Sequence, residues 1–262
     1  MQFSLGADPE IFCLGQDNNY RSAIDTFGGT KEQPRPLEEL GEGFYVQEDN
    51  VALEFNIPPS ETSDVFVKNI NSMVSHLSKL AAENFNLHFS KESGVLFPFE
   101  QLMDSRALEF GCEPDFNAWT GRKNPRPAAG DPRLRSAGGH VHVGVEEQLT
   151  KKDKCRIAQL MDLHLGIPSV LMDSGTMRKE LYGKAGAMRF KSYGLEYRTL
   201  SNFWVFEDHL NKWVWDATER ALSDYKSGVD ISSMEELLVG TINYNNTRQA
   251  SQIVSEYGLL TA

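Results

Sequence analysis

The chain has 262 residues, of which 26 are Lys or Arg and 37 are Asp or Glu, so its formal net charge is −11 at pH 7. A charge of this sign argues against direct binding to nucleic acid or to anionic membranes and is compatible with a soluble cytosolic enzyme. The sequence has no apolar run long enough to span a bilayer and no basic-then-apolar N-terminus, and its three widely spaced cysteines predict free thiols in a reducing compartment.

The length fits one large domain, which we expect to cover residues 1–262. Residues 3–14 read as the first strand, with Pro9 at a sheet edge or a bulge because proline cannot donate a ladder hydrogen bond. The segments 44–48 and 51–57 predict a hairpin around Asp49-Asn50, ended by Pro58-Pro59. Asp49 is therefore interpreted as a turn residue rather than a metal ligand.

Three helices follow from apolar residues spaced by three and four. The first begins near Thr62, the second follows the Thr150-x-x-Asp153 capping box and is interrupted at Gly166 and Pro168, and the third covers residues 203–223.

Residues 110–137 are rich in Pro and Gly and follow neither a helical nor a strand period. A connection of this length inside a domain is often a binding loop. We expect it to be a substrate loop or lid.

A glycine-bounded segment, Gly138 to Gly144, carries two imidazoles. In an extended strand His140 and His142 point to one face, while Val141 and Val143 point to the other. One face would then be polar and the other buried.

Three more segments place polar residues two apart, with apolar residues in the opposite phase. These pairs are Asp8 and Glu10, Glu54 and Asn56, and Glu196 and Arg198. If the four strands share a sheet with their polar faces aligned, four carboxylates gather on one side and repel one another unless cations neutralise them. Carboxylate oxygens with some imidazole favour Mg²⁺ or Mn²⁺, so the pattern predicts a divalent metal site.

The segment 175–194 is positively charged in a chain whose net charge is negative, because it contains five cationic residues and one acidic residue. It also contains four glycines. The cations are Arg178, Lys179, Lys184, Arg189 and Lys191. Glycines let backbone N–H groups approach phosphate oxygens, so the segment predicts binding of a polyanion. Because it leads directly into the Glu196 strand, we expect Lys184, Arg189 and Lys191 to contact the phosphates of a metal-bound nucleotide.

Five short segments, taken in order, resemble the carboxylate-amine ligases of tailed bacteriophages and, more distantly, the glutamine synthetase and glutamate-cysteine ligase catalytic fold. The segments are Gly6 to Glu10, Asp49 to Asn56, Phe110 to Trp119, Gly138 to Gly144 and Tyr193 to Trp204.

The resemblance implies an α+β fold, with a curved antiparallel sheet like that of the glutamine synthetase catalytic domain and helices packed on its outer face. It also implies an ATP-dependent ligase that joins a small-molecule or peptide carboxylate to an amine through an acyl phosphate, releasing ADP and phosphate. Two or more Mg²⁺ or Mn²⁺ ions would take part. A phage origin would place the protein in the cytoplasm of the infected bacterium, and nothing in the sequence signals an oligomeric assembly.

Residue roles follow from the matching positions. The metal ligands implied by the resemblance are Asp8, Glu10, Glu54, His140 and Glu196. His142 would approach the nucleotide phosphates, and Arg198, with Arg189 or Arg178, would stabilise the transferring phosphoryl group. Asp8 stands where relatives carry the longer Glu, and only Glu48 or Asp49 could supply a second acid beside Glu54.

Two other functions stay open. His140-x-His142-x₃-Glu146 fits the first metal motif of a cupin, which would be a single-metal enzyme or binding protein. A nucleotide-binding module without catalysis is the other alternative.

Overall fold

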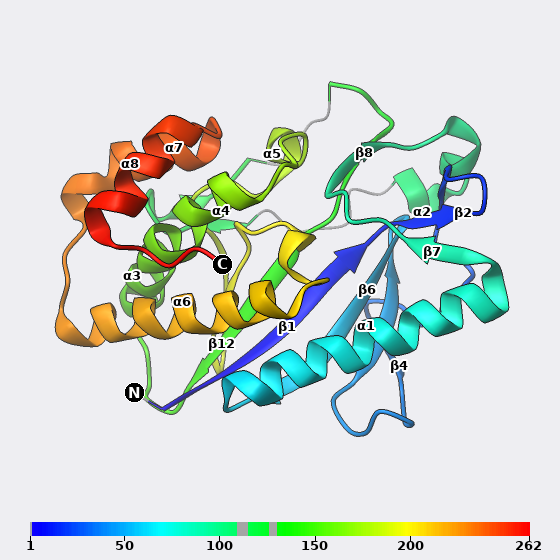
Figure 1. Ribbon diagram of the computed structural model, residues 1–262, viewed down its shortest axis with the longest axis horizontal. Coiled ribbons are helices and arrows are strands. Elements are labelled where there is room, and N and C mark those ends of the chain that lie inside the picture. The colour runs from blue at the N-terminus through cyan, green and yellow to red at the C-terminus, as the bar shows by residue number, and fades with distance from the viewer. Residues whose placement is uncertain (1, 109–114, 126–129) are drawn as a thin grey trace.

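The computed structural model describes residues 2–108, 115–125 and 130–262, and in this part of the chain a nine-stranded antiparallel sheet forms the centre (Figure 1). Its strands, in spatial order, are β10 (Arg122–Lys123), β9 (Phe116–Asn117), β13 (Ala187–Lys191), β14 (Gly194–Tyr197), β12 (Gly139–Val145), β1 (Phe3–Ile11), β6 (Ala52–Ser60), β5 (Tyr45–Asp49) and β4 (Arg35–Pro36). Two small sheets flank it, β3 (Tyr20–Arg21), β2 (Cys13–Gly15) and β7 (Leu87–Phe89), and β11 (Leu134–Ser136) with β8 (Gly94–Leu96).

The helices are α1 (Ser63–Phe85), α2 (Ser105–Leu108), α3 (Lys151–Met161), α4 (Ile167–Met172), α5 (Arg178–Leu181), α6 (Asp208–Ser227), α7 (Glu235–Asn243) and α8 (Thr247–Tyr257). A π-helical turn covers Asp162–Gly166, and short 3₁₀ turns cover Phe99–Leu102, Asn202–Trp204 and Ser232–Met234. No helix in the described residues is long and apolar enough to cross a membrane.

The long helices α1 and α6 lie across one face of the central sheet (Figure 1). The helix α1 begins next to Thr62 as expected, Thr62 caps it, and a stripe that includes Phe66 and Leu77 is fully buried. Val141 and Val143 of β12 lie in the same hydrophobic core. The predicted α+β class with an antiparallel sheet is confirmed, whereas the specific likeness to a glutamine synthetase domain and the single-domain organisation stay predictions.

The four polar-faced segments are neighbours in the sheet, in the order β14, β12, β1 and β6. Asp8 lies opposite His140, and His142 lies opposite Glu196. On the other side of β1, Glu10 lies opposite Glu54. Since side chains directly opposite each other share a face, the pairing aligns the polar phases as predicted.

Several boundaries differ from the expectations. Pro9 lies opposite Gly139 in a central strand, and the irregularity of β1 falls between Leu5 and Ala7, so its predicted edge or bulge position is wrong. The register of the buried strands outweighs the ladder hydrogen bond that proline cannot donate. The strand β6 continues to Ser60 through the two prolines.

The other differences concern the second helix and the expected loop. The predicted capping box of Thr150 and Asp153 is present at the start of α3. The predicted interruption at the other end of this helix is a π-helical turn rather than a break. Within the expected loop 110–137, residues 110–114 and 126–129 lie outside the described residues, and parts of the remainder form β9, β10 and β11.

A buried carboxylate in the π-helical turn joins three segments behind the sheet. Asp162 is fully buried and accepts hydrogen bonds from Trp119 Nε1 (2.6 Å), the Gly186 backbone N–H (2.6 Å) and Tyr197 Oη (2.7 Å). Gly186 has φ +74°, and a Cβ there would lie 2.7 Å from Trp119 Cδ1, so this close approach requires glycine. Asp162 thereby connects the 115–125 segment, the cation-rich segment and β14.

We expect Asp162→Asn to change how stability depends on pH. Burial raises the pKa of Asp162 from 3.8 to about 6, against the lowering effect of its hydrogen bonds. Between these two pKa values the folded protein keeps a proton on Asp162 that the unfolded chain has released. The stability that this proton contributes is fully present below pH 4 and is lost as the pH rises through 6. Asparagine does not titrate, so the free energy of unfolding of the variant should gain about 1–3 kcal/mol relative to wild type between these limits.

Urea unfolding at several pH values measures this difference. Glu219→Gln, an exposed substitution on α6, is the control. A difference between Asp162→Asn and wild type that does not change with pH would contradict the expectation.

Candidate functional site

Asp8, His142 and Glu196 form a first cluster, in which one ligand atom from each residue lies within 4.8 Å of the others. Asp8 Oδ1 lies 3.1 Å from His142 Nε2 and 3.2 Å from His140 Nδ1. Burial alone would raise the pKa of Asp8, but His142 and His140 hold that pKa well below its usual range. Asp8 is therefore ionised in the folded protein.

Tyr193 orients the second imidazole. Its hydroxyl lies 2.6 Å from His142 Nδ1, and the two rings stack with centroids 6.0 Å apart. Burial would lower the pKa of His142, but the charge of Asp8 and a hydrogen bond to it raise the pKa instead.

Cations surround Glu196, which has no exposed surface. Lys191 Nζ lies 2.7 Å from Oε2, Arg189 Nη1 lies 3.6 Å from Oε1, and Arg198 also bonds to this carboxylate. Burial and the charge of Asp8 would raise the pKa of Glu196, but Arg198 and the imidazoles lower it to about 2.

Arg198 is fixed from its other side by Asp115. Its Nε lies 2.6 Å from Asp115 Oδ1, and both side chains are buried. Its Nη1 lies 3.1 Å from His140 Nδ1. The guanidinium is thus held between two carboxylates, beside the strand that carries the imidazoles.

A second cluster consists of Glu10, Asp49 and Glu54, whose oxygens also lie within 4.8 Å of one another. Burial, together with the charges of the nearby carboxylates, raises the pKa of Glu54 well above its usual range. Glu10 accepts a hydrogen bond from the Gly138 backbone N–H (2.7 Å), and Asp49 pairs with Lys31 at 3.1 Å. A further cation is needed to keep all three groups ionised.

Both clusters have a composition that suits Mg²⁺ or Mn²⁺, because the first consists of two carboxylates and one imidazole and the second of three carboxylates. Asp8 Oδ1 and His142 Nε2 are both buried and face each other at 3.1 Å. Two potential ligand atoms in this arrangement fit a shared cation.

The structure brings most of the predicted site residues together. Asp8, Glu10, Glu54 and Glu196 lie in the two clusters, and Arg189, Lys191 and Arg198 contact Glu196. His140 contacts Asp8 but is in neither cluster, while His142, which was expected at the phosphates, belongs to the first. Lys184 is exposed and is not brought into contact with the acidic groups in the described structure.

Glu146, the third ligand of the cupin-like alternative, is exposed beyond the end of β12 and belongs to neither cluster. The geometry therefore does not favour that alternative.

Some functional candidates were not assigned from the sequence. Asp115 lies in a segment without period, and Tyr193 lies at the turn before β14, so neither shows the alternation that identified the strands. Asp49 does lie at the predicted turn, next to Asn50 with φ +58°, but its carboxylate also joins the second cluster. The sequence signal for Asp49 was its position in the motif ending at Asn56.

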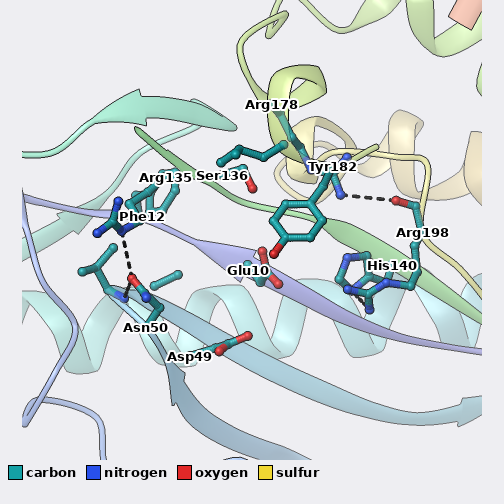
Figure 2. Close-up of a pocket in the computed structure, with 13 residues that line it drawn as sticks. Glu10, Phe12, Asp49, Asn50, Arg135, Ser136, His140, Arg178, Tyr182 and Arg198 are labelled. Atoms are coloured by element: carbon teal, nitrogen blue, oxygen red, sulfur yellow. Dashed lines mark hydrogen bonds between the residues drawn. The ribbon is translucent and has the colours of Figure 1, made fainter. Parts of the chain in front are cut away.

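A pocket of about 550 Å³, part of it open to solvent, borders the second cluster (Figure 2). Glu10 and Asp49 line one side, and Arg178 and Tyr182 line the opposite side. His140 and Arg198 close one end. Arg178, expected at the phosphoryl group, thus lies at this pocket.

Comparison with known proteins gives one family match. A solved structure of a bifunctional glutathione synthetase from Pasteurella multocida is similar at 11% identity with a TM-score of 0.42, over 98% of this chain and 49% of that one, so the chain spans about half the length of that protein. No curated protein matches the sequence. Residues 128–239, which contain His140, His142, Glu196 and the cation-rich segment, match the family described as Phage phiEco32-like COOH.NH2 ligase-type 2, which confirms the predicted resemblance to phage carboxylate-amine ligases.

Proposed function

We propose that the protein is an ATP-dependent carboxylate-amine ligase that forms an amide or peptide bond through an acyl phosphate and releases ADP and phosphate. The family match indicates the ligase class. The observation that carries the finer proposal is the pair of acidic clusters on adjacent strands, with Arg198, Arg189 and Lys191 at the edge of the first.

This arrangement suits transfer of a phosphoryl group. A carboxylate is a poor electrophile, and conversion to an acyl phosphate gives the carbonyl carbon a leaving group that an amine can displace. Enzymes promote such transfers chiefly by positioning the reactants and stabilising charge. Asp8, His142 and Glu196 would hold one divalent ion, and Glu10, Asp49 and Glu54 another. When bound, these ions spread the charge of the phosphate oxygens.

The cationic side chains that contact Glu196 differ in how firmly the surrounding structure holds them. Arg198 is buried and held by Glu196 and Asp115, so its guanidinium stays in one orientation. We assign it the role of holding the transferring phosphoryl group. Arg189 and Lys191 keep 28% and 31% of their side chains exposed, so they can turn toward nucleotide phosphates.

The proposal also includes the fold type, the place of action and the kind of substrate. The fold would be of the glutamine synthetase catalytic type, and the place of action would be the cytoplasm of a phage-infected bacterium. The acid and amine would be small molecules or peptides.

Metal-dependent nucleotide binding tests the site. Calorimetry with a non-hydrolysable ATP analogue should show binding that requires Mg²⁺ or Mn²⁺ and that weakens at least about tenfold in Glu196→Gln, because the amide removes a charge from the metal ligands. Glu219→Gln, exposed on α6, should bind like wild type. Absence of nucleotide binding, together with tight binding of one transition metal alone, would overturn the proposal in favour of single-metal chemistry.

Removal of the fixed guanidinium tests the mechanism. With an acid and amine pair identified by ADP release, Arg198→Ala should lower kcat by about 10³, by analogy with arginine groups that stabilise phosphoryl transfer. The matched control is Arg248→Ala on α8, whose side chain is exposed. A loss of less than tenfold would remove Arg198 from this role, and AMP with pyrophosphate as products would exclude the acyl-phosphate route.

A further inference from the structure

A row of residues with alternating charge crosses the site face of the sheet. Glu196 lies opposite His142 of β12 on one side and opposite Arg189 of β13 on the other. The register between β13 and β9, continued by one residue, places Asp115 opposite Arg189, and Asp115 Oδ1 lies 4.0 Å from Arg189 Nε. Because residues directly opposite each other share a face, Asp115 is the end of the row that begins at His142.

The same carboxylate contacts a second arginine. Arg198 Nε lies 2.6 Å from Asp115 Oδ1, and both side chains are buried. Burial lowers the pKa of Arg178, and the charge of Asp115 is among the effects that oppose this change. Asp115 therefore acts on each of the three arginines that the sequence predicts for the phosphoryl group.

Backbone hydrogen bonds fix the segment that carries Asp115. The Asn124 N–H donates to the Asp115 carbonyl oxygen at 2.7 Å, next to the pairing of β9 with β10. The Ala118 N–H donates to the Gly186 carbonyl oxygen at 2.9 Å, directly before β13. Asp115 is thus attached to the strand from which two of the site's cations project.

Metal binding does not account for this carboxylate. Among the described residues that could hold an ion, Asp115 belongs to neither acidic cluster. A negative charge beside cations that bind phosphates repels those phosphates, so the charge of Asp115 weakens anion binding. A carboxylate at this position needs another function, and its contact with Arg198 supplies one.

We propose that Asp115 is a positioning residue that keeps Arg198 oriented toward the transferring phosphoryl group while Glu196 binds a divalent ion. The inference rests on the proposed ligase function. In the structure, Glu196 and Asp115 share the guanidinium of Arg198. Once Glu196 directs its oxygens to an ion, Asp115 still holds the guanidinium from the other side through a charge-assisted hydrogen bond.

Asp115→Asn separates this role from a purely structural one. Calorimetry with Mg²⁺ and a non-hydrolysable ATP analogue should give nucleotide affinity that equals wild type or exceeds it by up to about tenfold, because the amide removes a repelling charge. With an acid and amine pair identified by ADP release, kcat should fall at least about a hundredfold, because Arg198 loses its fixed orientation. Loss of nucleotide affinity in proportion to the loss of kcat would overturn the proposal.

Further variants assign the effect to the pair. Asp115→Glu keeps the charge, so it should lose less kcat than Asp115→Asn at wild-type nucleotide affinity, and it serves as the test variant if Asp115→Asn does not fold. In an Arg198→Ala background, Asp115→Asn should lower kcat by less than about fivefold, because residues that act as a unit are not additive. Additive losses would overturn the proposal. The matched control is Asp104→Asn, which removes a carboxylate that pairs with Arg106 at 2.7 Å outside the site.

NMR of the full chain labelled with ¹⁵N-arginine tests the geometry without catalysis. The Arg198 Nε–H signal, identified by its loss in Arg198→Lys, should stay protected from solvent exchange in wild type when Mg²⁺ is added. In Asp115→Asn with Mg²⁺ the exchange should be at least about tenfold faster, because a neutral amide holds the guanidinium less strongly.

Two results separate this inference from the ligase function. If the exchange rate in Asp115→Asn equals that in wild type while wild type binds the nucleotide with metal, the role of Asp115 is wrong and the ligase function stands. If wild type binds no nucleotide with Mg²⁺ or Mn²⁺, the ligase function is wrong and this inference is wrong with it.

Discussion

Repulsion among carboxylates on one face of the sheet is the constraint on which the rest of the structure depends. Asp8, Glu10, Glu54 and Glu196 come from three strands, and antiparallel register places them on one face of the sheet, where all but Glu10 are buried. Like charges at this spacing destabilise the fold unless cations are supplied. The first cluster has its own cations and imidazoles, whereas in the second cluster burial and the neighbouring carboxylates raise the pKa of Glu54.

Contacts on the opposite face of the sheet position the strands that carry the acidic residues. On β14, Glu196 faces the cations while its neighbour Tyr197 donates to Asp162 on the helical side. Asp162 also holds Gly186, which lies directly before β13 and Arg189. The buried network behind the sheet thus sets the position of the strands from which the site's cations project.

Much of this arrangement was predictable from the sequence, because the alternation of polar and apolar residues has the period of a strand. This alternation predicted that Asp8, Glu10, Glu54 and Glu196 lie on one face of the sheet, although the order of the strands was unknown. Residues outside regular strands carry no such signal, so Asp115 and the charged pocket around Arg178 depended on tertiary packing. Pro9 was misplaced because local chemistry gave an edge position, whereas the register of two long neighbours determined a central one.

The central claim is that a carboxylate is activated by ATP at this face. Transfer of ¹⁸O tests it most directly, with a substrate acid labelled in both carboxylate oxygens and the released phosphate analysed by mass spectrometry. The account predicts one ¹⁸O atom in each phosphate formed, because the acyl-phosphate bridge oxygen comes from the carboxylate. Unlabelled phosphate formed together with the amide product would contradict it.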